Sequence, residues 1–134
     1  MKVCVFSGSR SEYGLLKELL KLLFKDSFFK TDLIVSGSHL SKKYGLSVKE
    51  IVDDKIKIKK KFVLDLKMST AFGICQNFSD INSKINNFFK TNKYDVLILL
   101  GDRYESLAVA IAGYINRNPI AHIHGGEKTE DSLD

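Results

Sequence analysis

The residues best suited to chemistry lie near the end of the chain, in two short segments that each follow a run of apolar residues. Asp102 and Arg103 come just after the apolar run at 96–100, and residues 122–127, His-Ile-His-Gly-Gly-Glu, follow a second run at 119–121. Side chains at the ends of neighbouring strands converge in an open α/β sheet, so these groups predict one site. The alternative is that Asp102 only caps the next helix and that the histidines are ordinary loop residues.

A second candidate site lies in the segment at 8–14, Gly-Ser-Arg-Ser-Glu-Tyr-Gly, which follows the first apolar run and opens a helical pattern. A glycine-rich turn lets backbone approach a ligand, the helix N-terminus offers free N–H groups to a phosphate, and Arg10 can add a bidentate contact. Arg10 replaces the second glycine of the dinucleotide fingerprint, and Ser-Gly-Ser at 36–38 replaces the expected ribose-binding acid. The segment therefore disfavours NAD and favours a phosphate or nucleotide, with a simple tight turn as the alternative.

Both sites require strands that end beside one another, and the apolar patterning supplies them. Strands are predicted at 3–6, 32–36, 56–64, 96–100 and 120–123, and helices at 15–23, 39–44, 47–52, 69–88 and 105–115. Alternation of strands and helices, with continuous apolar strands, predicts a doubly wound α/β fold with a mostly parallel sheet covered on both faces. The last two strands are expected to be buried.

Composition narrows the class of protein. The 134 residues allow one domain, 1–134, with a real core. The net charge is +5, and the lysines are spread along the chain except at Lys55–Lys61, where they alternate with isoleucine. This segment contains no aromatic residues that could stack on bases, which argues against nucleic-acid binding. Cys4 and Cys75 fall at predicted buried positions, as free thiols in a reducing compartment do. With no signal-peptide pattern and no membrane-length apolar run, the sequence predicts a cytoplasmic protein without membrane contact.

Four segments together resemble the UDP-N-acetylglucosamine 2-epimerase family, above all its hydrolysing branch in sialic and legionaminic acid synthesis. They are SGSRSEYGLLKELL at 7–20, VSGSHLSKKYG at 35–45, LLGDRYESLAVAIA at 99–112 and IAHIHGGEKTEDSLD at 120–134. The resemblance implies a Rossmann-like domain that is one half of a two-domain, glycosyltransferase-like architecture, with the active site between the halves. It also implies elimination of UDP through a glycal-type intermediate, then hydration with inversion at C2, without NAD and without an obligatory metal.

The resemblance assigns catalytic roles to four residues. Asp102 matches the aspartate of the family's GDR motif, and His124 stands where many members carry a glutamate, so both are implied as acid/base groups. Glu127 is implied as a carboxylate beside the sugar. Asp134 aligns with the acid of a later TEGAID-like run, although Asp131 departs from that run by replacing a glycine. These residue types suit the reaction, because abstraction of a proton at C2 needs a base that titrates near neutral pH.

The expected contacts to the substrate come from the same segments. The candidate binding residues are Gly8, Arg10, Glu12, His39, Arg103, Glu105, Gly125 and Gly126. The implied substrate is UDP-N-acetylglucosamine or a related UDP- or GDP-sugar, and the products are N-acetylmannosamine and UDP.

Length shapes the expected partners. Because family members are more than twice as long, the resemblance implies an N-terminal half whose second domain is supplied in cis or in trans, with little turnover alone. We also expect an exposed apolar patch for docking and a possible homodimer. The alternatives are a nucleotide-sugar-binding module without catalysis and a glycosyltransferase donor domain.

Overall fold

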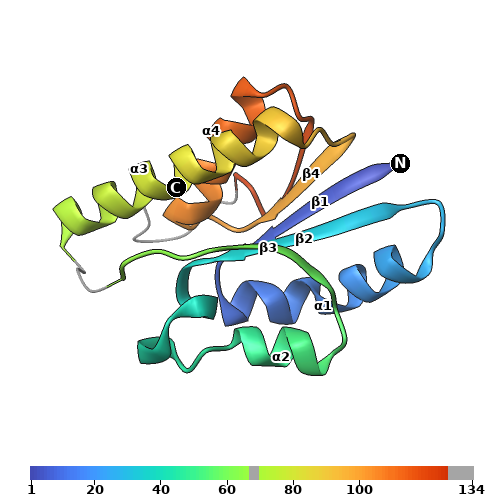
Figure 1. Ribbon diagram of the computed structural model, residues 1–134, viewed down its shortest axis with the longest axis horizontal. Coiled ribbons are helices and arrows are strands. Elements are labelled where there is room, and N and C mark those ends of the chain that lie inside the picture. Colours follow the sequence, from blue (N-terminus) through green and yellow to red (C-terminus); the bar gives the residue numbers. More distant parts are fainter. Residues whose placement is uncertain (67–69, 127–134) are drawn as a thin grey trace.

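A five-stranded parallel sheet forms the centre of the molecule (Figure 1). The structure is a computed structural model, and it describes residues 1–66 and 70–126. The strands are β1 (Lys2–Ser7), β2 (Lys30–Ser36), β3 (Ile58–Phe62), β4 (Val96–Leu100) and β5 (Ile120–Ile123), and their spatial order is β3-β2-β1-β4-β5. The helices are α1 (Arg10–Lys25), α2 (Val48–Asp53), α3 (Ala71–Thr91) and α4 (Tyr104–Ile115), with 3-10 turns η1 (Gly37–Leu40) and η2 (Lys42–Tyr44). The predicted doubly wound α/β fold is confirmed.

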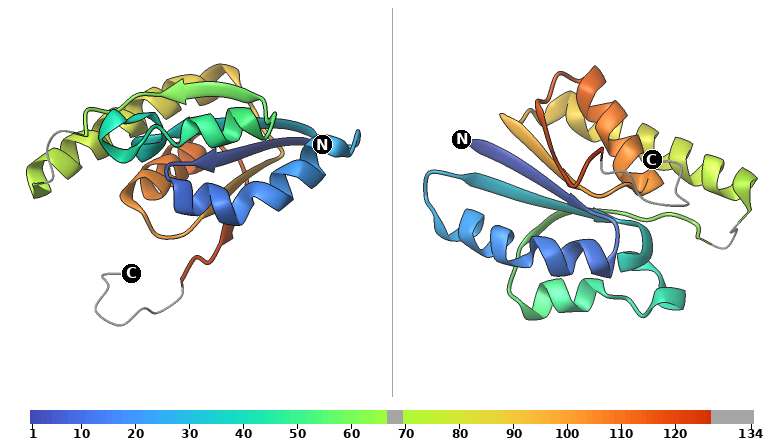
Figure 2. Two further views of the ribbon diagram at one scale, coloured as in Figure 1. Left: turned by 90° about the horizontal axis from the view of Figure 1, so that it is seen from below. Right: turned by 180° about the vertical axis from the view of Figure 1, so that it is seen from behind.

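Helices cover both faces of the sheet, and alternate residues of β1 pack into the two hydrophobic cores on either side. Val5 packs in the core beneath α1 together with Leu20, and Phe6 packs on the other face with Ile85 and Phe89 of α3. Figures 1 and 2 show α1 and α2 on one side of the sheet and α3 and α4 on the other. Because each strand residue alternates between the faces, an unbroken apolar run such as that of β1 is what a sheet buried on both sides requires.

Strand β3 contains a bulge that changes which face its side chains occupy. The register with β2 pairs Ile58 with Leu33 and Lys60 with Ile34, so Lys59 is the extra residue. Before the bulge, Ile58 packs on the α1 side, whereas Phe62 beyond it packs in the core under α3. The strand predicted at 56–64 is shorter than expected, at Ile58–Phe62, and its apolar residues pack on two different faces of the sheet.

Two expectations about burial are wrong. In the described part of the chain, strand β5 lies at the edge of the sheet, next to β4 alone, and its residues are mostly exposed, among them Ile120 at 37% exposure. Cys75 is exposed on α3, although Cys4 is buried as expected. The core face of α3 follows steps of four through positions such as Asn77 and Ile81, which turns position 75 away from the sheet.

Candidate functional site

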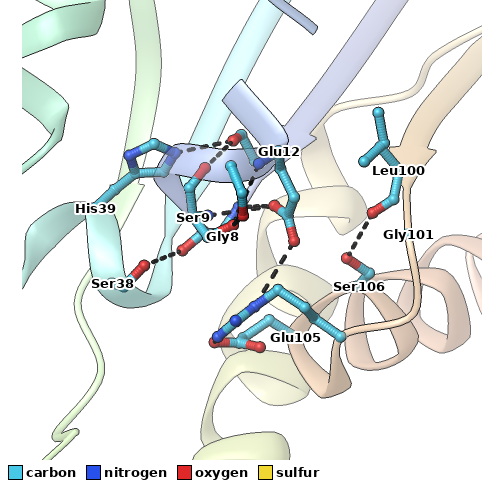
Figure 3. A network of polar contacts seen from close by, with 12 residues as sticks. Gly8, Ser9, Glu12, Ser38, His39, Leu100, Gly101, Glu105 and Ser106 are labelled. Carbon is cyan, nitrogen blue, oxygen red and sulfur yellow. Dashed lines mark hydrogen bonds and ion pairs between the residues drawn. The ribbon is translucent and has the colours of Figure 1, made fainter. Parts of the chain in front are cut away.

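The strand order of the sheet reverses between β1 and β4, because β2 and β3 lie on one side of β1 and β4 and β5 lie on the other. A reversal of this kind opens a crevice at the C-terminal ends of the two central strands. The turn that joins β1 to α1 and the turn that joins β4 to α4 both border this crevice (Figure 3). Each of the two segments singled out in the sequence therefore lies at the same end of the sheet.

The first turn is fixed by a capping box at the start of α1. Ser9 is the N-cap residue, and its hydroxyl accepts from the backbone N–H of Glu12. In return, Glu12 Oε2 accepts from the backbone N–H groups of Gly8 at 2.5 Å and Ser9 at 3.2 Å. These bonds satisfy donors that a helix start otherwise leaves free. The sequence Ser-x-x-Glu at 9–12 carries this signature, which the sequence reasoning missed.

Glu12 also belongs to a charged cluster with Arg103 and Glu105. Figure 3 shows the two glutamate side chains of this cluster. The Nη2 of Arg103 donates to Glu105 Oε1 at 2.9 Å, and its Nε lies 3.7 Å from Glu12 Oε1. The side chains of Glu12 and Glu105 are 5% and 0% exposed. Burial raises the pKa of Glu12 to about 7, against the lowering effect of the Gly8 N–H and of Arg103. Two carboxylates thus share one guanidinium between the two turns.

Gly37 allows the loop after β2 to pack closely on this cluster. Its φ is +61°, and a Cβ there would lie 2.5 Å from the Gly8 carbonyl oxygen and 2.9 Å from Glu105 Oε1. The hydroxyl of the next residue, Ser38, donates to the same Gly8 carbonyl at 3.2 Å. Only glycine fits both the left-handed conformation and the space.

His39, a predicted substrate contact, is fully buried below the first turn. Its Nε2 lies 2.9 Å from the Ser7 hydroxyl and its Nδ1 lies 2.9 Å from the Ser47 hydroxyl. Burial lowers the pKa of His39 to about 4, so the ring is neutral at physiological pH. In this structure His39 supports the turn from within the protein.

A cavity of about 870 Å³ opens above the first turn. Its polar lining comes from three turns and from α3, and includes Ser9, Arg10, Ser38, Asn77, Arg103 and Tyr104. Arg10 is exposed on one wall, where its Nε lies 2.7 Å from Glu50 Oε1. Hydroxyls, amides and two guanidinium groups around a helix N-terminus suit a phosphate-containing ligand.

A second cavity, of about 410 Å³, lies between the ends of β4 and β5. It is lined by Asp102, Arg103, His122, His124, Gly125 and Gly126 among others. The His122 ring is held by a 2.6 Å contact between its Nε2 and the Gly101 carbonyl, and it packs against the Gly125 backbone. The carboxyl and imidazole groups predicted to act as acid and base therefore share one hollow.

Most candidate residues that the structure describes lie in this region, some of them at the cavity walls and others buried beneath. Arg10, Arg103, Asp102 and His124 line the cavities, and Glu12 and His39 are buried behind them. Glu105 is buried as well, but it forms part of the wall of the larger cavity. Glu127 and Asp134 lie outside the described residues.

The sequence did not single out Ser38 and Asn77, which line the larger cavity, and His122 was included in the predicted cluster without a role of its own. Asn77 left a signal in the sequence, since it is a polar residue on the core face of an amphipathic helix. Within residues 1–66 and 70–126, no three metal-ligating side chains come together. None of the helices in that part is long and apolar enough to span a membrane.

Comparison with known proteins decides the family. A family model described as UDP-N-acetylglucosamine 2-epimerase matches residues 21–134. The chain belongs to this family. It is 36% identical over 133 residues to the polysialic acid biosynthesis protein P7 of Escherichia coli, across 99% of this chain. It is 35% identical to the GDP/UDP-N,N'-diacetylbacillosamine 2-epimerase (hydrolyzing) of Campylobacter jejuni, again across 99% of this chain.

The 2-epimerase chain spans 34% of the length of either relative. Among solved structures, the UDP-GlcNAc 2-epimerase of Neisseria meningitidis bound to UDP-GlcNAc matches with a TM-score of 0.82 and 19% identity, over 98% of this chain and 33% of that one. At this identity the likeness shows the fold, and it confirms the Rossmann-like prediction.

Proposed function

We propose that the chain forms the N-terminal, Rossmann-like half of a hydrolysing nucleotide-sugar 2-epimerase. The substrate is UDP-N-acetylglucosamine or a related UDP- or GDP-sugar, and the products are the free 2-epimerised sugar, N-acetylmannosamine in the first case, and the nucleotide diphosphate. The observation that carries the proposal is the pair of adjoining cavities at the C-terminal ends of β1 and β4, one rich in phosphate-binding groups and one with acid/base groups. Support also comes from relatives named as hydrolysing 2-epimerases.

The larger cavity is proposed to hold the diphosphate. Ser9, Arg10 and Ser11 line it from the first turn, and Arg103 lines it from the second. Negative charge grows on the diphosphate as the bond to the sugar breaks, so cationic groups here stabilise the transition state.

The smaller cavity is proposed to hold the reacting part of the sugar. Asp102 and His124 are the described candidates for removing the proton at C2 and for delivering one to the opposite face of C2 as water adds at C1. Glu127 and Asp134 remain candidates in the same roles. No cofactor is needed for this scheme, because elimination and hydration transfer protons and water and change no oxidation state overall.

The rest of the active site is proposed to come from a second domain, in cis or in trans, as the shortness of the chain relative to its relatives suggests. Apolar side chains exposed on α4 offer a surface for that domain or for a second copy; they are Leu107, Ile111, Tyr114 and Ile115. We also propose that the protein acts in the cytoplasm, where Cys4 and Cys75 stay reduced.

Phosphorus and proton NMR test the proposal. The chain alone should bind UDP-N-acetylglucosamine and release little product. A chimera in which it replaces the corresponding third of the Campylobacter jejuni relative should release UDP and free N-acetylmannosamine. Asp102→Asn in the chimera should lower the rate by on the order of 10² to 10⁴. A folded chimera that binds the nucleotide-sugar but never releases product would instead support a binding module without catalysis.

A further inference from the structure

Arg103 is the one residue of the described chain that lines both cavities. Its side chain is 41% exposed, whereas the side chain of Glu105, which accepts its hydrogen bond at 2.9 Å, is 0% exposed. That bond uses one of the five N–H donors of a guanidinium, so a ligand can reach other donors from either cavity. The proposed function gives no role to Glu105, the fully buried carboxylate that accepts a hydrogen bond from this exposed cation.

The carboxylate of Glu105 is buried, and its Oε2 has no hydrogen-bond partner in the part of the chain that the structure describes. Glu105 lies in the first turn of α4, and the absence of a side chain at Gly37 gives its Oε1 room beside the loop after β2. A second carboxylate, Glu12, faces the Nε of Arg103 at 3.7 Å through an Oε1 that has no hydrogen-bond partner among the described residues. The guanidinium therefore has one hydrogen-bonded anchor, Glu105, and one charged neighbour, Glu12.

We propose that Glu105 is a positioning residue: it holds the Arg103 guanidinium at the boundary of the two cavities, so that it binds a phosphate of the nucleotide-sugar beside Asp102. This inference rests on the proposed function, because it takes the ligand to be a nucleoside diphosphate. Arginine has a long and flexible side chain, and ordering it in advance removes a cost that binding would otherwise carry. The same anchor keeps the positive charge close to the groups that move protons.

The sign of one substitution separates positioning from a purely electrostatic effect. As a negative charge near the site, Glu105 repels a diphosphate, so its removal would tighten binding if charge alone mattered. As an anchor for Arg103, Glu105 strengthens binding, so its removal should weaken it. We expect Glu105→Gln to lower the affinity of the chain for UDP on the order of tenfold, which is the effect of freeing one rotamer-rich side chain.

Titration of the chain with UDP by NMR, at fixed pH and salt, measures this effect. Glu105→Gln should have no further effect in an Arg103→Ala background, and Glu105→Asp should restore part of the affinity. Glu50→Gln is the matched control, because Glu50 pairs with Arg10 at 2.7 Å on the other wall but is 42% exposed. This control should leave UDP affinity unchanged or slightly higher.

Three outcomes are informative. Weaker binding that depends on Arg103 supports the inference. Unchanged or tighter binding by folded Glu105→Gln overturns positioning and leaves the proposed function intact, whereas a wild-type chain that binds no UDP at millimolar concentration overturns both. A second measurement uses the wild-type protein alone, so it does not depend on a variant that folds. In ¹⁵N relaxation of the arginine Nε groups, Arg103 should be ordered and Arg10 mobile, and equal mobility of the two side chains would count against the inference.

Discussion

The buried carboxylate of Glu12 makes a quantitative prediction about how stability depends on pH. Burial raises its pKa from the usual 4.5 to about 7, so the folded protein binds this proton more tightly than the unfolded chain does. Between these two pH values the folded state carries more protons, and stability therefore falls as the pH rises. The full stabilisation by the protonated group is present below pH 4.5 and is lost as the pH passes about 7.

The size of this effect follows from the same pKa change. A rise from 4.5 to about 7 corresponds to about 3 kcal/mol of unfolding free energy. Glu12→Gln removes the titration but keeps the shape of the side chain and an oxygen that can accept from the Gly8 and Ser9 N–H groups. Relative to this variant, the wild type should lose about 3 kcal/mol of unfolding free energy as the pH rises through that window.

Urea unfolding at several pH values from about 4.5 to about 8 measures the difference between the two proteins. Glu18→Gln is the control, because Glu18 lies on the same helix with a side chain that is 78% exposed. The control should differ from the wild type by a nearly constant amount across the range. If the Glu12→Gln difference were equally constant, the burial of a carboxylate in the Arg103 cluster would not govern its titration, and the reasoning would be refuted.

Three further predictions follow from local packing. Gly37→Ala should lower the unfolding free energy by about 1–3 kcal/mol, because Gly37 has a positive φ and a new Cβ would meet the Gly8 carbonyl. Gly14→Ala in helix α1 should raise the unfolding free energy by about 0.5–1 kcal/mol, because nothing lies within 4 Å of a new Cβ there. Urea unfolding of the two variants measures both changes. A thiol reagent should modify exposed Cys75 in the folded protein and buried Cys4, whose pKa burial also raises, only on unfolding; equal rates would contradict this. Phe89→Ala, at a fully buried position, should lower the unfolding free energy by about 3–5 kcal/mol, and a change under about 1 kcal/mol would mean that the α3 core is misplaced.

The fold was largely predictable, because apolar periodicity depends on which faces of an element are buried. The strands at 96–100 and 120–123 have the predicted bounds, and the helix predicted at 105–115 begins one residue earlier. The exposure of β5 was not predictable, since a four-residue apolar run reads the same at the edge of a sheet as at its centre. The bulge at Lys59 was not predictable either, because a bulge depends on the register of β3 with β2.

The site was predictable in its location and less so in the roles of its residues. Arg10 and Asp102 line cavities as expected, since they come directly after strand ends. Glu12 and Glu105 were predicted to contact the ligand. Their carboxyl groups lie buried against Arg103, and Glu105 also lines the larger cavity, a placement that depends on how three separate turns pack together.

The bulge at Lys59 has a consequence for how the molecule behaves among its own copies. An edge strand offers unpaired backbone groups to other chains, and sheets joined edge to edge grow into aggregates. By shifting the phase of β3, the extra residue leaves three consecutive lysines, Lys59–Lys61, exposed along this edge. Two copies that approach through β3 bring like charges together on a kinked strand. The residue that lets one strand serve both cores thus also keeps the sheet from extending at that edge.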